Sequence, residues 1–445
     1  MVRLACLCIA LSLLLTGCMR LDPPEKAGEL VVAIPDDPVF YQPPPEIGQG
    51  GGFEYDLLTA FAAELKVALR LVVAGSTAEM RELLRDGKVH MAAAMPIEAA
   101  PDLRFSAALH KAQPLIVQHG DAAPFDDPED LALHVVDVPR ASPLVPVLRT
   151  LTPPPQLNEL EGHDIDVLAR VNDRLSDLAA TDSLHFAVAT NYYPDLSIAQ
   201  GLGDSIVYGW AFRSEDEILR ARADTFMAQA QADGSMTRLR DRYYGHIKRI
   251  GANNMAQFLQ LMQTRLPRYR ALFHEAQLLT GIDWRLLAAV AYQESTWDPL
   301  ATSFTGVRGM MMLTEDTADH LRVSNRLDAR QSILAGARYL VDLMEGVPKE
   351  APHPDRLWLA LSAYNIGPGH FNGAVAIARS LKRDPASWYE MKKVLPLLAR
   401  PQYYERLKSG RARGGEAVIM VENIRNFYDV LSRFEPPYVP VVKPQ

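Results

Sequence analysis

One carboxylate stands where an apolar helical stripe ends. In DWRLLAAVAYQES, residues 283–295, apolar residues recur three and four positions apart, and the face that carries Leu287 and Ala291 reaches Glu294 next. A carboxyl group at the edge of a helical core is partly removed from water, and this desolvation raises its pKa. A carboxylic acid that stays protonated near neutral pH is suited to general acid catalysis. The alternative is a surface glutamate in the last turn of a helix.

Further candidate groups lie near Glu294 or on a second predicted helix. Ser295 follows Glu294 directly, and a glycine-punctuated loop leads to Met310–Met312. The helical run RLWLALSAYN ends on Tyr364 and Asn365, whose side chains can point into a groove. Each also has a structural explanation. A helix-terminal serine often bonds its own backbone, methionines fill cores, and a tyrosine before a helix stop can be a core residue.

Other kinds of site chemistry are not indicated. The 11 histidines are scattered without a His-Glu-x-x-His pattern, and the 3 cysteines are Cys6, Cys8 and Cys18. No Gly-x-Ser-x-Gly motif occurs either. We therefore expect no metal and no cofactor. The net charge of −8 and the lack of a Lys/Arg-rich segment exclude nucleic acid as an expected partner.

The chain opens with MVRLACLCIALSLLLTGC, residues 1–18. Arg3 precedes a short apolar core, which is typical of a secretory signal and too short to span a membrane. The ending Leu-Thr-Gly-Cys resembles a bacterial lipobox, which implies a signal peptide over residues 1–17 and acylation of Cys18. By the same resemblance, Met19 in place of Asp favours the outer membrane, on its periplasmic face. The alternative is a plain signal peptide with an incidental cysteine.

Strands and helices alternate over residues 29–246, after a polar segment, 18–28, that we expect to be a tether. ELVVAIP and LRLVVAG are β-branched runs, and the amphipathic helix GFEYDLLTAFAAELKVAL separates them. A second series of such elements follows, and a long and a shorter helix close this part. The alternation indicates an α/β domain with a parallel sheet.

This order of elements resembles the periplasmic solute-binding domains of amino-acid uptake systems (family 3 type), which are two-lobed. In that family an arginine shortly before a Phe-Ser pair grips the ligand carboxylate, but here PIEAAPDLRFS places Arg104 directly beside Phe105. The second lobe has Thr190 and Asn191 near the position of the family's ligand aspartate. We therefore expect no free amino acid as ligand. A cell-wall fragment such as a muropeptide, or a bare spacer role, remains open.

Residues 247–445 have a helical hydrophobic period throughout, divided by glycine and proline. Three motifs occur there in order: Glu294-Ser295, Gly309 to Met312, and Ala363-Tyr364-Asn365. They resemble the catalytic core of the lysozyme-like lytic transglycosylases. With the preceding domain and the lipobox, the mature chain resembles the membrane-bound lytic murein transglycosylase F family. The expected fold class is therefore multidomain, α/β plus α, with an all-α lysozyme-like domain at the end.

The resemblance implies that the substrate is the glycan strand of peptidoglycan. Glu294 would protonate the β-1,4 oxygen between N-acetylmuramic acid and N-acetylglucosamine, and would then take the proton of the C6 hydroxyl as it closes to a 1,6-anhydro sugar. Water is not the nucleophile, so one carboxylate is enough, whereas ordinary glycosidases need two. The residues expected to bind the substrate are Ser295, Met311, Met312, Tyr364 and Asn365.

Two positions depart from that family. Met312 stands where many relatives have glutamine, and Met420 stands where a tyrosine commonly lies near the acid. Tyr428 is a candidate to replace that tyrosine. Two rival functions therefore stay open: a non-catalytic lipoprotein that binds or senses peptidoglycan, and a hydrolase that leaves reducing ends.

Overall fold

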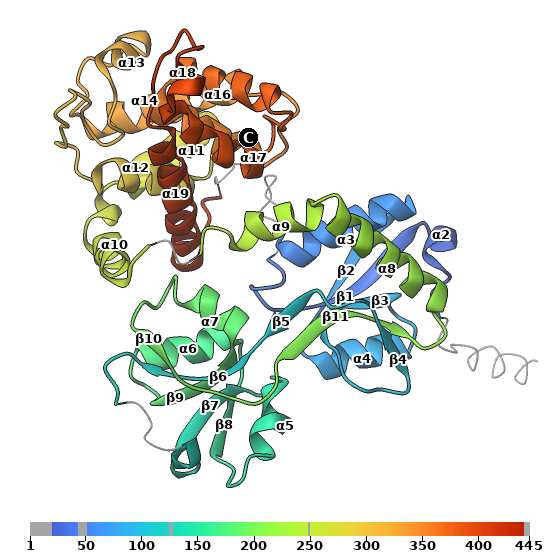
Figure 1. The fold of residues 1–445 in the computed structure, drawn as a ribbon. Coiled ribbons are helices and arrows are strands. Elements are labelled where there is room, and N and C mark those ends of the chain that lie inside the picture. Colours follow the sequence, from blue (N-terminus) through green and yellow to red (C-terminus); the bar gives the residue numbers. More distant parts are fainter. Residues whose placement is uncertain (1–19, 43–50, 124–127, 248–249, 440–445) are drawn as a thin grey trace, which may run out of the picture. The chain divides into compact units, whose positions relative to one another are not determined.

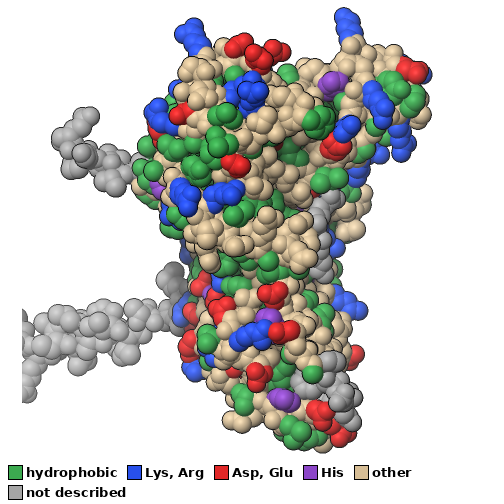
Figure 2. All heavy atoms as spheres, turned by 90° about the vertical axis from the view of Figure 1, so that its left-hand side faces the viewer, with side chains coloured by type: hydrophobic (Ala, Val, Ile, Leu, Met, Phe, Trp, Pro, Cys, Tyr) green, Lys and Arg blue, Asp and Glu red, His purple; other side chains and the backbone are tan. Residues whose placement is uncertain are grey.

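The computed structural model describes residues 20–42, 51–123, 128–247 and 250–439. The chain forms two compact units, Met1–Tyr243 and Tyr244–Gln445. The signal peptide and Cys18 lie outside the described residues. On the face drawn in Figure 2, acidic and basic side chains are interspersed over the surface.

The first lobe of the first unit is a mixed sheet in the strand order β2-β1-β3-β11-β4, with β5 paired to β11. Its strands are β1 (Glu29–Pro35), β2 (Ala68–Ala74), β3 (Met91–Pro96), β4 (Leu103–Phe105), β5 (His110–Ala112) and β11 (Ile206–Arg213). Its helices are α2 (Pro24–Ala27), α3 (Phe53–Leu65), α4 (Thr77–Arg85), α8 (Glu217–Ala232) and α9 (Ser235–Tyr244). Helix α4 covers one face of the sheet and α3 and α8 cover the other (Figure 1), so β1 is buried on both sides.

The second lobe is a sheet in the order β10-β6-β9-β7-β8. Its strands are β6 (Pro114–His119), β7 (Val135–Pro139), β8 (Gln156–Leu160), β9 (Leu178–Asp182) and β10 (Leu196–Gly201). Its helices are η1 (Pro128–Leu133), α5 (Leu144–Arg149), α6 (Asp164–Asn172) and α7 (Ser183–Ala189). The two-lobed α/β fold expected from the sequence is confirmed.

Two expectations for this unit are corrected. The sheets are mixed rather than parallel, because β11 pairs antiparallel with β3, β4 and β5, and β6 pairs antiparallel with β9 and β10. Residues 20–28 are not a free tether. The Leu21 amide donates to the Gly87 carbonyl at 3.0 Å, the His90 ring bonds the Asp22 carbonyl at 2.8 Å, and α2 begins at Pro24.

The second unit is helical throughout, as expected. Its elements are α10 (Ala252–Thr264), η2 (Leu266–Arg268), α11 (Arg270–Thr280), α12 (Trp284–Ser295), α13 (Glu315–His320), α14 (Ala329–Gly346), α15 (Asp355–Ile366), α16 (Pro368–Ser380), α17 (Trp388–Val394), η3 (Leu395–Ala399), α18 (Pro401–Tyr404) and α19 (Gly414–Phe434). Helix α12 is buried continuously from Trp284 to Tyr292. The long helix α19 packs against α12 and α15 (Figure 1), and the burial of α12 places it in the core of this unit.

Candidate active site

Helix α12 presents Glu294 one residue before its end. The helix begins where the Asp283 side chain accepts a hydrogen bond from the Arg285 amide at 2.8 Å. It ends because Thr296 and Trp297 adopt left-handed backbone angles, with φ of 51° and 58°. Trp297 is fully buried, and its indole N–H donates to the Ala288 carbonyl at 2.8 Å. This fold-back fixes the last turn and, with it, the direction of Glu294.

The Glu294 carboxyl group is partly buried and forms no hydrogen bond or ion pair with any described residue. Desolvation alone raises its pKa to about 8. The group therefore carries its proton at neutral pH, as the position on the helix predicts. An unpaired, protonated carboxyl at a partly open position can transfer that proton to a bound molecule.

Three side chains from three helices hold the backbone of the methionine loop. The Ser295 hydroxyl lies 2.9 Å from the Met310 carbonyl and 3.0 Å from the Ala291 carbonyl. The Met311 amide donates to the Ser332 hydroxyl at 3.1 Å, and the Tyr364 phenol donates to the Met311 carbonyl at 2.6 Å. These bonds tie α12, α14 and α15 to one short segment, which fixes it beside the end of α12.

Backbone geometry completes this loop. Gly309 has φ +85°, and a Cβ atom there would lie 1.8 Å from the Arg326 carbonyl oxygen, so only glycine fits. Met312 has φ 48°, an unusual value for a side chain other than glycine. The Arg326 guanidinium donates to the carbonyls of Gly306 and Leu313 at 2.9 and 3.1 Å. The loop is therefore held from both ends.

Tyr364 lies close enough to Glu294 for the two groups to interact electrostatically. Burial first, then the Glu294 charge, raises the pKa of the Tyr364 phenol well above its usual value. The phenol therefore stays neutral and remains a donor. Its ring lies 5.5 Å from that of Tyr339. Asn365 is exposed, and its side-chain amide forms no hydrogen bond with the described residues.

The five predicted substrate-binding residues differ in how far they reach solvent. Asn365 is exposed and Met312 is partly exposed. Met311 is fully buried, and Ser295 is 8% exposed with its hydroxyl directed at carbonyl groups of the protein. The expectation that the side chains of Met311 and Ser295 touch the sugar does not fit these positions, because Met311 is enclosed in the core and the Ser295 hydroxyl is already bonded to protein carbonyls. Tyr364 is partly buried, with its hydroxyl already bonded.

Sequence reasoning missed the groups that support the loop. Ser332 and Gly336 lie on α14, and a Cβ atom at Gly336 would stand 2.7 Å from the Met311 Cβ. Their signal is a serine and a glycine at i and i+4, which lie on one face of the helix. The proposed replacement by Tyr428 is corrected. Its hydroxyl bonds the Asp283 carboxylate at 3.1 Å, at the opposite end of α12 from Glu294. Met420 is buried, at 3% exposure.

The first unit has a second candidate site, a cavity of about 90 Å³ between its lobes. Asp37 follows β1 of the first lobe, and His185 lies on α7 of the second lobe. The His185 ring contacts the Asp37 carboxylate at 2.8 Å and that of Asp182 at 2.9 Å. The Tyr208 hydroxyl also donates to Asp182, at 2.9 Å. The two lobes are therefore bridged by the protein's own ionisable side chains.

The electrostatics of this cluster follow from its burial and its neighbours. Burial raises the pKa of Asp164 to about 6. Burial would also raise that of Asp182, but His185 and Tyr208 outweigh it and lower the pKa to about 2. His185 is held protonated by the carboxylates that surround it, against the effect of burial. Among the described residues that line the cavity there is no arginine or lysine, and Arg104 bonds the carbonyls of Pro101 and Leu103 instead.

Within the ranges that the structure describes, no group of three or more His, Cys, Asp or Glu side chains is arranged to hold a metal ion. In the same part of the chain, no helix is long and apolar enough to cross a membrane.

Two family models match the chain: bacterial extracellular solute-binding proteins, family 3, over residues 30–246, and the transglycosylase SLT domain over residues 271–386. A membrane-bound lytic murein transglycosylase F of Nitrosospira multiformis is 40% identical over 433 residues, covering 94% of this chain and 88% of that protein. That of Methylobacillus flagellatus is 39% identical over 447 residues, covering 97% of this chain and 94% of that protein. Because this similarity extends over both units, the chain belongs to the membrane-bound lytic murein transglycosylase F family.

Proposed function

We propose that Glu294 is the acid and base of this lytic murein transglycosylase, an enzyme of peptidoglycan turnover. Its proton passes to the β-1,4 oxygen that leaves N-acetylmuramic acid, and the C–O bond at C1 breaks. The Glu294 carboxylate then takes the proton of the C6 hydroxyl, whose oxygen bonds C1. Glu294 is protonated again, no water is consumed, and the product ends in a 1,6-anhydro sugar.

The observation that carries this proposal is the unpaired Glu294 carboxyl, whose pKa desolvation raises to about 8. An ion-paired carboxylate at this position would have lost its proton at neutral pH and could not act first as an acid. No second carboxylate is assigned, because the C6 hydroxyl of the substrate replaces the water that a second carboxylate would activate. Asn365 and Met312 are proposed to contact the sugar, since both reach solvent near the same loop.

Mass spectrometry of the fragments released from purified peptidoglycan tests the reaction. We expect 1,6-anhydro ends. Hydrated, reducing ends would identify a hydrolase instead, and no release at all would identify a non-catalytic binding protein. The family membership and the protonated acid both favour the first outcome.

The location is proposed from the sequence. Lipid attachment at Cys18 would hold the enzyme on the periplasmic face of the outer membrane, within reach of its substrate. Metabolic labelling with a radioactive fatty acid should label the wild-type chain and not the Cys18→Ala variant. Membrane fractionation should place the label in the outer membrane. Label in the inner membrane alone would contradict the sorting part of this proposal.

For the front unit, we propose that the cleft takes a peptide-bearing wall fragment, such as a muropeptide. The carboxylates of Asp36, Asp37, Asp164 and Asp182 line it with two imidazoles, those of His163 and His185. Such a set attracts an ammonium group more readily than a carboxylate. Wall peptides can carry a free amino group, whereas a ligand recognised mainly by its carboxylate would face repulsion. The alternative is a spacer whose lobes stay closed on their own contacts.

A further inference from the structure

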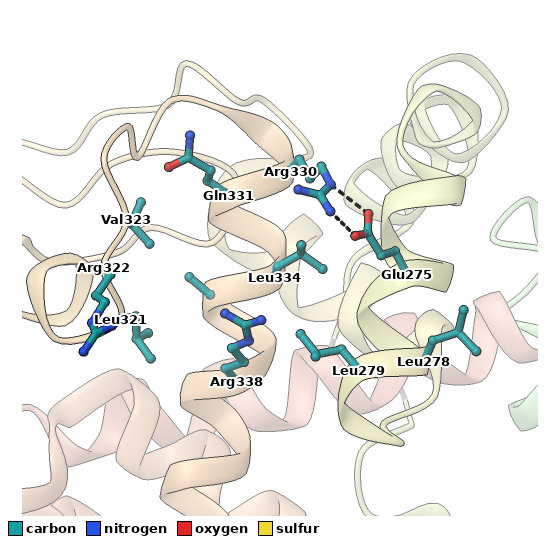
Figure 3. A pocket seen from close by; sticks show the side chains of 11 residues that line it. Glu275, Leu278, Leu279, Leu321, Arg322, Val323, Arg330, Gln331, Leu334 and Arg338 are labelled. Atoms are coloured by element: carbon teal, nitrogen blue, oxygen red, sulfur yellow. Dashed lines mark hydrogen bonds and ion pairs between the residues drawn. The ribbon is translucent and has the colours of Figure 1, made fainter.

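A pocket of about 450 Å³ lies in the helical unit between α11, α14 and the segment that follows α13 (Figure 3). Glu294 is not among its lining residues. A volume of this size falls within the range of pockets that bind small molecules. The residues that line it are Glu275, Leu278, Leu279, Leu321, Arg322, Val323, Arg330, Gln331, Leu334, Ala335 and Arg338.

Helix α14 separates this pocket from the methionine loop. Ser332 and Gly336, one turn apart, face Met311. Leu334 and Arg338 are also one turn apart, and they line the pocket. Positions two residues apart on a helix point in roughly opposite directions. One face of α14 therefore supports the active-site loop, and the opposite face is free to receive a ligand.

The pocket has a surplus of positive charge. Glu275 is the only acidic residue among its described lining residues, and its carboxylate is already paired with Arg330. The guanidinium groups of Arg322 and Arg338 are exposed and form no hydrogen bond or ion pair with the described residues. In Figure 3, Arg338 extends from α14 between Leu321 and Leu279, and Arg322 lies beyond Leu321. Two unpaired guanidinium groups thus lie beside the leucine side chains that line the pocket. We call Leu279, Leu321 and Leu334 the leucine floor.

The wall that carries Arg322 is fixed rather than loose. Gln331 Oε1 accepts hydrogen bonds from the amides of Ser324 and Asn325, at 3.0 and 3.2 Å, which ties this segment to α14. Opposite it, Leu278 and Leu279 remain 57% and 45% exposed. The pocket is thus complementary to a molecule that carries carboxylates and small apolar groups, since guanidinium binds carboxylate with paired hydrogen bonds.

We propose that this pocket binds the acidic peptide stem borne by the glycan strand that the same unit cleaves. The inference rests on the proposed function, because that function places the peptide beside the enzyme. A stem peptide offers free carboxylates and alanine methyl groups, which match the two arginines and the leucine floor. An anionic lipid has the same charge and is a separate outcome of the test.

The test compares the mature full chain with the Arg322→Gln/Arg338→Gln double variant. Binding is measured by co-sedimentation with peptide-bearing peptidoglycan and with glycan strands whose peptides an amidase has removed. The double variant should bind the peptide-bearing material about tenfold more weakly and the stripped strands as well as wild type. Arg379→Gln, on the exposed end of α16, is the matched control and should change neither. Arg338→Lys, which keeps charge but loses the paired geometry, should fall between.

Cleavage of stripped strands should be equal in all these variants, and this readout separates the pocket from the catalytic proposal. The pocket proposal would be overturned if the double variant bound peptide-bearing peptidoglycan as well as the wild type does. So would an arginine-dependent attachment to vesicles that contain phosphatidylglycerol, if binding to peptide-bearing peptidoglycan were unchanged. If the wild-type chain released no anhydro fragments from either material, that would instead contradict the proposed function.

Discussion

The Tyr364 phenol donates a 2.6 Å hydrogen bond to the Met311 carbonyl, while the same phenol lies within electrostatic range of Glu294. One side chain thus links the end of α15 to the loop and to the acid. Its contact with Met311 is to the backbone, so it depends on the path of the loop rather than on the side chain at position 311. Tyr364 is therefore a positioning residue whose loss should disturb the geometry of the site more than the fold.

Tyr364→Phe should lower kcat about tenfold with a smaller change in KM, because the loop loses one of its three ties while the acid remains. The free energy of unfolding should fall by about 1–2 kcal/mol, since the Met311 carbonyl loses a buried partner. Steady-state turnover of peptidoglycan and thermal melts measure the two effects. Tyr339→Phe is the control, because it removes a neighbouring phenol that does not bond Met311. Equal losses in both variants would contradict the specific role of Tyr364.

Glu294→Gln should abolish the release of anhydro fragments while leaving the fold intact. The amide has nearly the same shape, but it can neither donate a proton to the glycosidic oxygen nor accept one from C6. Mass spectrometry of the released fragments and a circular dichroism spectrum measure activity and fold together. Turnover close to that of the wild type would show that Glu294 is not the acid.

Activity should fall as pH rises through the pKa of Glu294, about 8, because only the protonated carboxyl can act first as an acid. The fall should follow a single ionisation on the alkaline side of the kcat/KM profile, which reports ionisations of the free enzyme. Tyr364→Phe tests the assignment, since removal of this neighbour should leave the alkaline limb in place at lower amplitude. An alkaline limb that begins below pH 6 would mean that Glu294 is ionised in the resting enzyme.

The same ionisation should be visible in stability. Between about pH 4.5, the usual carboxyl value, and about pH 8, the folded state holds one proton more than the unfolded state. Stability therefore decreases as pH rises through this window. Glu294→Gln lacks this decrease. The variant should equal the wild type near pH 4.5 and exceed it by on the order of 4 kcal/mol near pH 8. Denaturant titrations at both pH values measure the gap, and a constant gap would contradict the raised pKa.

Gly336→Ala should displace the methionine loop, because the new Cβ would lie 2.7 Å from Met311 Cβ and Cγ. Overpacking of this kind costs about 1–3 kcal/mol, and turnover should fall with it. Gly346→Ala is the matched control at the end of the same helix, where nothing lies within 4 Å of an added Cβ. Thermal melts of the two variants measure the loss of stability that each substitution causes. A loss at Gly346 as large as that at Gly336 would point to a general effect of glycine replacement.

The helix that carries Glu294 could be predicted from sequence because its signal is local. The apolar period runs to residue 294, and the structure ends α12 at Ser295. The burial of Met311 could not be predicted, because it depends on Gly336 and Ser332, which are more than 20 residues away along the chain and bear no periodic relation to the loop. A methionine run alone fits a groove and a core equally well.

The antiparallel strand β11 escaped prediction for a related reason. Its residues, Ile206–Arg213, form an apolar run that suits a buried strand in either direction. The direction is set by pairing with β3, more than 100 residues earlier. The lobe-bridging pair of Asp37 and His185 is separated by 148 positions, so no spacing rule could bring it together.

The front unit should not bind free amino acids. No arginine or lysine is among the described residues that line its cleft, and Asp37, Asp164 and Asp182 face inward, so an amino-acid carboxylate would meet like charge. Calorimetric titration of the mature chain with the common amino acids should give no binding tighter than about millimolar, roughly −4 kcal/mol.

A wall peptide with a free amino group should bind more tightly, and His185→Ala should alter that binding because it breaks the contact between the lobes. Catalysis would respond to such a ligand only if lobe closure changes contacts that the helical unit also uses. Micromolar binding of a free amino acid would show that the cleft recognises solutes as ordinary family 3 proteins do. If no peptide binds, the spacer role is the one that remains.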